Sequence, residues 1–164
     1  MENRTTSWTR ASMLVAVIAL IAAACSSSTN TPPGPLDSNM EGIPPVPELD
    51  AASVEQGGVL YQAQCAACHG ADLSGADDWK TRNEDGTFKP PPHDVSGHTW
   101  HHPDQLLTGL IQDGGSSPDS VMPAFGDKLT DDEIASILDY LKSNWGPEER
   151  GFQWMVTWQE LQRG

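Results

Sequence analysis

Basic residues are scarce in this chain of 164 residues, which carries nine Lys and Arg against 23 Asp and Glu. The formal net charge at pH 7 is -14, and the acidic residues are spread along the whole length. Because neutralising nucleic-acid phosphates requires clustered Lys and Arg, this composition excludes DNA and RNA as partners. It fits a self-repelling protein with a solvated acidic surface, which would meet basic surfaces on its protein partners.

Cysteine is also rare, and the three that are present do not make a disulfide framework. Apolar residues make up only 37% of the chain, so its side chains alone would build a modest core. No segment shows the alternation of apolar and polar residues that is typical of a strand. The length and these patterns predict one all-α domain with tails.

Only one long apolar run is present, from Ala11 to Ala24, and basic residues precede it. Such a run, too short for a comfortable membrane span, is typical of an export signal, so we expect residues 1–24 to be a signal peptide. The run ends in Ala22-Ala23-Ala24-Cys25, which resembles a bacterial lipoprotein box, although Ala22 stands where Leu is usual. The resemblance implies lipidation of Cys25; cleavage after an Ala-x-Ala site and an uncleaved anchor are the alternatives. All three predict an extracytoplasmic domain, and lipidation or an uncleaved anchor would attach it to the membrane.

Residues 25–50 are rich in Ser, Thr, Asn and Pro, so we expect an extended tether there, or an ordinary disordered leader. Residues 51–147 are expected to form the domain and residues 148–164 a C-terminal tail. The apolar residues of that tail predict a short helix, which either packs on the domain or docks a partner.

Three helices are predicted within the domain. The segment Ser53–Gln56 has the form of a capping box and opens a helix that runs to Gly70. A second helix begins with Pro103 at its first position and ends at Gly114 and Gly115. A third begins with a capping box at Thr130 and ends at Gly146-Pro147. Its apolar residues recur at helical period: Ile134, Ile137, Leu138, Leu141 and Trp145.

The most specific motif is Cys65-Ala66-Ala67-Cys68-His69. Two thiols at this spacing can form thioether bonds to the vinyl groups of one haem, and the histidine is then held beneath the iron as an axial ligand. The predicted cofactor is one haem c, which would also add apolar surface to the core. A thioredoxin-like pair would need a βαβ context, and a zinc site would need further ligands at defined spacing.

Met122 is the predicted second axial ligand of the iron. Pro123 restricts it to extended backbone geometry, which suits a strap across the far face of the haem. The other methionines lie in the export segment, the tether and the tail. A second histidine ligand or a separate metal site are alternatives that rest on four residues: His93, His98, His101 and His102.

The order of these features resembles the class I c-type cytochromes over residues 53–146. In that family a small residue and an aromatic of the first helix cross an aromatic-Leu pair of the last, and Gly57-x-x-x-Tyr61 and Tyr140-Leu141 fit this pattern. The resemblance implies the cytochrome c fold, three main helices around one covalently bound haem. It also implies that Trp100 donates its indole N–H to a haem propionate; an aromatic wall is the alternative.

These features predict a one-electron carrier between redox proteins, such as membrane oxidoreductases or terminal oxidases, and not an enzyme. A haem enzyme or gas-binding sensor with a labile sixth ligand is the alternative. The long segment from Gly70 to His102 is expected to wrap the haem edge.

Overall fold

The computed structural model describes residues 42–163. The predicted signal peptide, Cys25 and the tether up to residue 41 lie outside the described residues, so the expectations on export and lipidation stay predictions. Between residues 42 and 163 the chain forms helices and loops, and its one β-bridge joins Arg82 to Phe88 without making a strand. The predicted all-α class is confirmed. No helix in this part is both long and apolar enough to cross a lipid bilayer.

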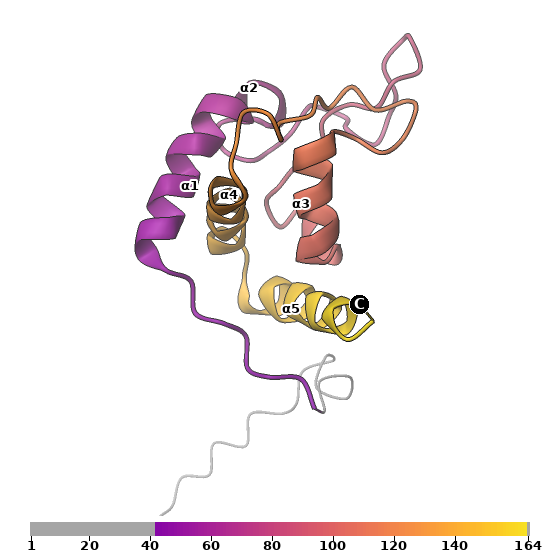
Figure 1. The fold of residues 1–164 in the computed structure, drawn as a ribbon. Coiled ribbons are helices and arrows are strands. Elements are labelled where there is room, and N and C mark those ends of the chain that lie inside the picture. The colour runs from indigo at the N-terminus through magenta and orange to yellow at the C-terminus, as the bar shows by residue number, and fades with distance from the viewer. Residues whose placement is uncertain (1–41, 164) are drawn as a thin grey trace, which may run out of the picture. The chain divides into compact units, whose positions relative to one another are not determined.

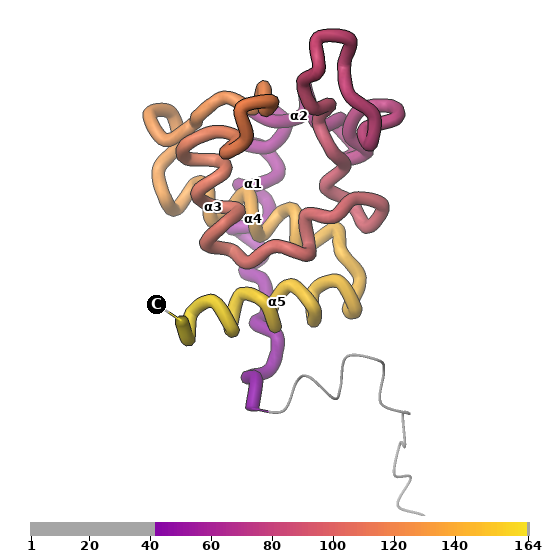
Figure 2. The backbone as a smooth tube through the Cα atoms, turned by 90° about the vertical axis from the view of Figure 1, so that its right-hand side faces the viewer, coloured from indigo at the N-terminus to yellow at the C-terminus, as the bar shows by residue number. Residues whose placement is uncertain are grey.

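Within residues 42–163, the fold consists of five α-helices and one 3₁₀ turn (Figure 1). They are α1 (Ala51–Gln64), α2 (Ala66–His69), η2 (Thr99–His101), α3 (Asp104–Asp113), α4 (Asp131–Ser143) and α5 (Pro147–Leu161). The first helix predicted from the sequence corresponds to α1 together with α2. The second corresponds to α3 and the third to α4. Figure 2 shows the loop between α3 and α4 and the first part of the loop between α2 and α3 at the end of the molecule away from α5. The η2 turn, near the end of the second loop, lies against α5.

Helices α1 and α4 cross in close contact and build the centre of the core. Gly57 lies directly against the backbone of α4, since a Cβ placed on it would come within 1.8 Å of the Ser136 carbonyl oxygen. Tyr61 is fully buried, and its ring centroid lies 5.4 Å from that of Tyr140. The predicted crossing is therefore present, with one refinement: Gly58, rather than Gly57, faces the Tyr140 ring.

The start of the first helix differs from the prediction. Asp50 is the N-cap, and its carboxylate accepts a hydrogen bond of 2.9 Å from the Ser53 backbone N–H. Ser53 therefore lies inside α1, where its hydroxyl donates to the Asp139 carboxylate of α4 at 2.8 Å. Asp and Ser are equally good N-caps, so the local sequence allows the helix to start after Asp50 or after Ser53. The hydrogen bond of Ser53 to α4 favours the start after Asp50.

The other helix ends agree with the sequence signals in part, and α4 ends at Ser143, before the predicted Gly146-Pro147. Thr130 and Glu133 form the predicted capping box of α4. Pro103 is the N-cap of α3 rather than its first helical residue, and α3 ends where Gly114 adopts a φ of +86°. The first helix does not run unbroken to Gly70: α1 ends at Gln64 and α2 follows after Cys65.

The predicted tail forms α5, a helix that packs on the domain. Its Gln153 is buried and donates to the Asp104 carboxylate at 2.7 Å, while the hydroxyl of Thr157 accepts from the Asp104 N–H at 3.0 Å. The ring of Phe152 meets that of Trp100 edge to face, with centroids 5.7 Å apart. The packed helices thus continue beyond residue 147, and α5 supports the loop that carries Trp100.

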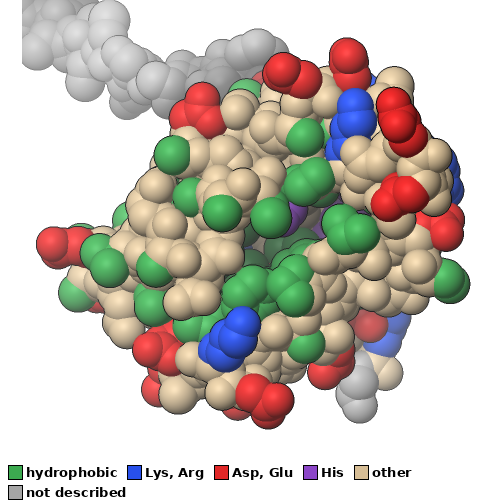
Figure 3. Space-filling view, turned by 90° about the horizontal axis from the view of Figure 1, so that it is seen from above, with side chains coloured by type: hydrophobic (Ala, Val, Ile, Leu, Met, Phe, Trp, Pro, Cys, Tyr) green, Lys and Arg blue, Asp and Glu red, His purple; other side chains and the backbone are tan. Residues whose placement is uncertain are grey.

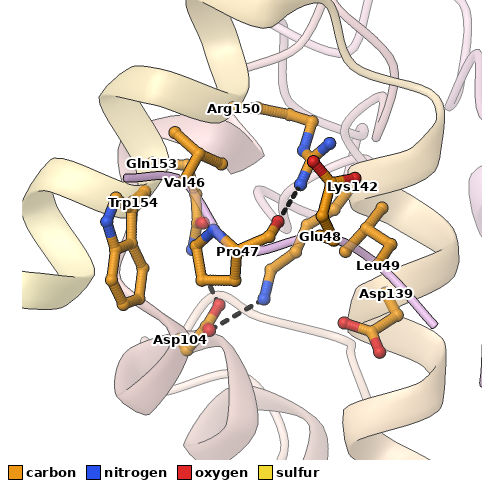
Figure 4. A pocket seen from close by; sticks show the side chains of 10 residues that line it. All are labelled: Val46, Pro47, Glu48, Leu49, Asp104, Asp139, Lys142, Arg150, Gln153 and Trp154. Carbon is orange, nitrogen blue, oxygen red and sulfur yellow. Dashed lines mark hydrogen bonds and ion pairs between the residues drawn. The ribbon is translucent and has the colours of Figure 1, made fainter. Parts of the chain in front are cut away.

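Residues 42–50, predicted as the end of the tether, lie along α5 (Figure 4). Trp154 donates its indole N–H to the Pro44 carbonyl at 2.7 Å, and Arg150 donates to the Pro47 carbonyl at 2.6 Å. A cavity of about 210 Å³ lies beside this segment and includes the ion pair of Lys142 with Asp104, at 2.8 Å. The described chain therefore begins beside α5, remote from α2 (Figure 1).

Candidate cofactor site

The break between α1 and α2 places the two thiols. Cys65 donates its backbone N–H to Tyr61 at the end of α1, and its carbonyl accepts from His69 at 3.0 Å, which starts the new turn. Cys65 is half-buried, Cys68 is exposed, and neither forms a disulfide. Burial, and to a smaller extent Cys68, raises the pKa of the Cys65 thiol to about 11. A reactive redox cysteine has a lowered pKa, so this environment does not favour thioredoxin-like chemistry.

His69 is buried, with 8% of its surface exposed, and its ring is oriented by one hydrogen bond. The Nδ1 atom lies 2.9 Å from the Pro91 carbonyl oxygen. Because a carbonyl only accepts, Nδ1 carries the proton and Nε2 keeps a lone pair, which is the form that binds a metal. Burial lowers the pKa of His69 and so keeps the imidazole neutral, an effect larger than the opposing hydrogen bond to Pro91.

His93 supports His69, a role that the sequence analysis missed. The two imidazoles stack with centroids 4.1 Å apart and an interplanar angle of 25°. Its Nδ1 lies 2.8 Å from the Thr99 hydroxyl, and its carbonyl accepts from the Trp145 indole at 2.7 Å. Burial, followed by repulsion from His69, lowers the pKa of His93 to about 3. The sequence signal for this role was the run Pro90-Pro91-Pro92 directly before His93. Its rings restrict the backbone that carries both the Pro91 carbonyl and His93.

The structure also bears on the histidine alternatives. With His69 as the proposed ligand, a second histidine would have to reach the iron from the opposite side, whereas the His93 ring is stacked on the His69 ring itself. Among residues 42–163, no group of three or more His, Cys, Asp or Glu could hold a metal ion. The described residues therefore give no support to the separate metal site considered for the His93–His102 segment. His98 instead stacks on Trp79, and His101 packs against Trp100.

Met122 lies half-buried against the core on the loop between α3 and α4. Its carbonyl accepts from the Gly115 N–H at 3.1 Å, and its own N–H donates to the Ser120 hydroxyl at 3.2 Å. A Cβ on Gly114 would lie 2.9 Å from the Met122 carbonyl oxygen, and the φ of +86° there already favours glycine. The end of α3 thus holds the backbone of Met122 in place.

Trp100 is half-buried against the core, and its Nε1 is a buried atom with no hydrogen-bond partner among the described residues. The Nδ1 atom of His98 is also buried and has no hydrogen-bond partner among the described residues. Leaving a buried polar group unpaired costs about 1–3 kcal/mol. An indole N–H can only donate, so the Trp100 atom fits an acceptor on a bound group, and the Nδ1 atom of His98 fits the same acceptor when it carries the proton. Figure 3 shows a hollow walled by hydrophobic side chains with histidine at its floor. An apolar ring system with carboxylates at its edge, which is what haem is, fits this donor set.

The fold and this site define a class I c-type cytochrome with one haem: helices without strands in the described chain, and a Cys-x-x-Cys-His motif at the turn between α1 and α2. Residues 52–141 match the family described as cytochrome c oxidase, cbb3-type, subunit III, and the chain belongs to this family.

Several curated proteins are similar to this chain. The cytochrome subunit of fructose dehydrogenase from Gluconobacter japonicus is 33% identical over 100 residues, 55% of this chain and 18% of that protein. The cbb3-type cytochrome c oxidase subunit FixP from Sinorhizobium medicae is 27% identical over 112 residues, 65% of this chain and 35% of the relative. Cytochrome c6 from Bryopsis maxima is 26% identical over 91 residues, 56% of this chain and 91% of the relative.

The chain spans about a fifth of the length of the first of these relatives and about a third of the second. No solved structure matches it. The family identifies the cofactor as covalently bound haem c and the role of the domain as haem-mediated electron transfer. The relatives are named as cytochromes or cytochrome subunits, one of them from a dehydrogenase, and they do not favour the haem enzyme or gas sensor.

Proposed function

We propose that this domain is a one-electron carrier and not itself an enzyme. In this proposal Cys65 and Cys68 form the thioether bonds to the haem, and His69 and Met122 are its axial ligands. The haem supplies an iron that changes reversibly between the ferric and ferrous states. The observation that carries the proposal is the hydrogen bond from His69 Nδ1 to Pro91, because it leaves Nε2 as the nitrogen available to a metal.

The surroundings of His69 support electron transfer more than catalysis. Tyr61, whose hydroxyl donates to the His69 carbonyl at 3.3 Å, is fully buried, and Leu73 is 3% exposed. Two strong axial ligands in such a setting limit rearrangement when the iron changes charge, and a thioether sulfur stabilises the ferrous form. The stacked His93 further restricts the His69 ring.

The partners that we propose are other redox proteins outside the cytoplasm. Relatives named as subunits of a terminal oxidase and of a dehydrogenase support a membrane oxidoreductase as donor or acceptor. The net charge of -14 favours basic surfaces on such partners. Covalent haem attachment and the predicted export signal both point to an extracytoplasmic location. A lipid on Cys25 would hold the carrier at the membrane and raise its local concentration near these complexes.

Redox titration with carbon monoxide as a probe tests this function on the purified, haem-loaded protein. We expect a single reversible one-electron wave and no carbon monoxide binding to the reduced protein at neutral pH, because Met122 occupies the sixth position. Rapid stoichiometric binding would contradict the carrier and support the gas sensor or haem enzyme. The apoprotein, prepared in a host unable to attach haem, serves as the spectral blank.

A further inference from the structure

His98 has an environment that haem ligation does not use. Its ring lies flat against Trp79, with centroids 5.2 Å apart and an interplanar angle of 11°, and meets His102 edge to face at 5.4 Å. The Nδ1 atom is buried and has no hydrogen-bond partner in the described part of the chain. The ring is thus packed in one orientation with a polar atom turned away from solvent, a costly arrangement unless an acceptor is present.

The segment that carries His98 is fixed next to the axial histidine. Thr99 is buried, and its hydroxyl donates to the Pro92 carbonyl at 3.3 Å. The hydroxyl oxygen of Thr99 also accepts a hydrogen bond from His93 Nδ1. His93 in turn stacks on His69. The two unpaired buried nitrogens belong to His98 and Trp100, the neighbours of Thr99 in the sequence. Thr99 is in turn connected through His93 to His69.

We propose that His98 donates its Nδ1–H to a carboxylate of the bound haem, beside the indole N–H of Trp100, and couples proton uptake to reduction of the iron. The inference rests on the proposed function, since it needs the haem held at His69. The two donors differ in their titration. An indole does not titrate, whereas an imidazole that already carries a proton on Nδ1 takes up a second one from solvent on Nε2 near neutral pH. Reduction removes one positive charge from the iron, so the reduced protein binds that proton more tightly.

The charges around His98 set the range in which this proton would be bound. Burial, then repulsion from His101 and Lys80, lowers the pKa of His98, and His102 packs against its ring. Lys80 itself lies over the Trp79 ring, 5.3 Å from the centroid. On the proximal side, His93 is kept neutral by burial. A haem carboxylate accepting from Nδ1 would oppose these effects and favour the charged imidazole.

The test is the midpoint potential as a function of pH for the haem-loaded protein, its His98→Gln variant and a His101→Gln control. His101 is exposed and is the last residue of the 3₁₀ turn that His98 caps, so its replacement leaves the unpaired nitrogen of His98 in place. We expect the potential of the wild type to fall as pH rises between about pH 5 and pH 8, the range in which histidine titrates. The His101→Gln variant should keep this dependence but show it at higher pH, because the repulsion from His101 that lowers the pKa of His98 is removed. The His98→Gln variant should lose it.

Either a wild-type potential that does not change with pH or an unaltered dependence in His98→Gln would overturn the inference. If His98→Gln does not take up haem, the His98 ring is titrated by NMR in the wild type instead. The inference then requires a higher pKa for His98 in the reduced protein than in the oxidised one, and equal values would contradict it. A pH-independent one-electron wave would leave the electron-transfer function intact, so the two proposals fail separately.

Discussion

Replacing Met122 by alanine is expected to remove the sulfur-to-iron charge-transfer band of the oxidised protein, lower the midpoint potential and allow carbon monoxide to bind the reduced protein. The reason is that alanine offers no sixth ligand, so the thioether no longer stabilises the ferrous form. Met122 is only half-buried, and its backbone is held by Gly115 and Ser120. The variant should therefore fold and keep its haem, and visible spectra with a redox titration measure the effect.

Met155→Leu is the matched control for Met122→Ala. Met155 is buried in α5, at 8% exposure, and its exchange for leucine removes a thioether while keeping an apolar side chain of similar volume. The control should retain the charge-transfer band and the potential of the wild type. Survival of the band in Met122→Ala, or its loss in Met155→Leu, would show that Met122 is not the ligand.

Replacing Gly57 by alanine is expected to destabilise the domain strongly, although it adds only one methyl group. The new Cβ would lie 1.8 Å from the Ser136 carbonyl oxygen and 3.0 Å from the Ile137 nitrogen, both backbone atoms of α4. No side chain can rotate away, so α1 and α4 must separate. Overpacking of a core lowers the free energy of unfolding by about 1–3 kcal/mol. Because this clash is with backbone atoms, we expect a loss of about 3 kcal/mol or more. For a domain of this size, we expect the melting temperature to fall by about 10 °C or more.

Gly109→Ala provides the comparison for this change. Gly109 lies in α3, and a Cβ there would have no atom within 4 Å. Alanine in the interior of a helix is more stable than glycine by about 0.5–1 kcal/mol, so this variant should melt slightly higher than the wild type. Thermal unfolding of both haem-loaded variants, followed by far-UV circular dichroism, gives the comparison. Equal melting temperatures for Gly57→Ala and the wild type would contradict the close crossing of α1 and α4.

Sequence reasoning was most successful where the information is local. The capping box at Thr130 and the apolar period that follows it define α4 without reference to other parts of the chain. The haem motif is equally local, since its chemistry depends on the spacing of Cys65, Cys68 and His69 alone. The close approach of Gly57 to α4 was also expected, but from the family resemblance rather than from local pattern.

The features that sequence reasoning missed depend on contacts between distant residues. Asp50 and Ser53 are both good N-caps. The side chain of Ser53 is bonded to Asp139 of α4, and Asp50 is the residue that caps α1. The segment before α1 has a composition typical of a disordered tether, yet Trp154 of α5 donates to its Pro44. His93 was considered only as a ligand, of the iron or of a separate metal, because nothing in the linear pattern shows that its ring stacks on His69.

The most direct test of the central claim, that Cys65 and Cys68 bind one haem covalently, is the intact mass of the denatured protein purified from a host that attaches haem to exported proteins. The account predicts a mass that exceeds that of the polypeptide by one haem, which stays with the chain through denaturation and extraction. The double variant Cys65→Ser, Cys68→Ser should lack this added mass. A wild-type chain recovered colourless, or one whose haem is removed by acid and organic solvent, would contradict it.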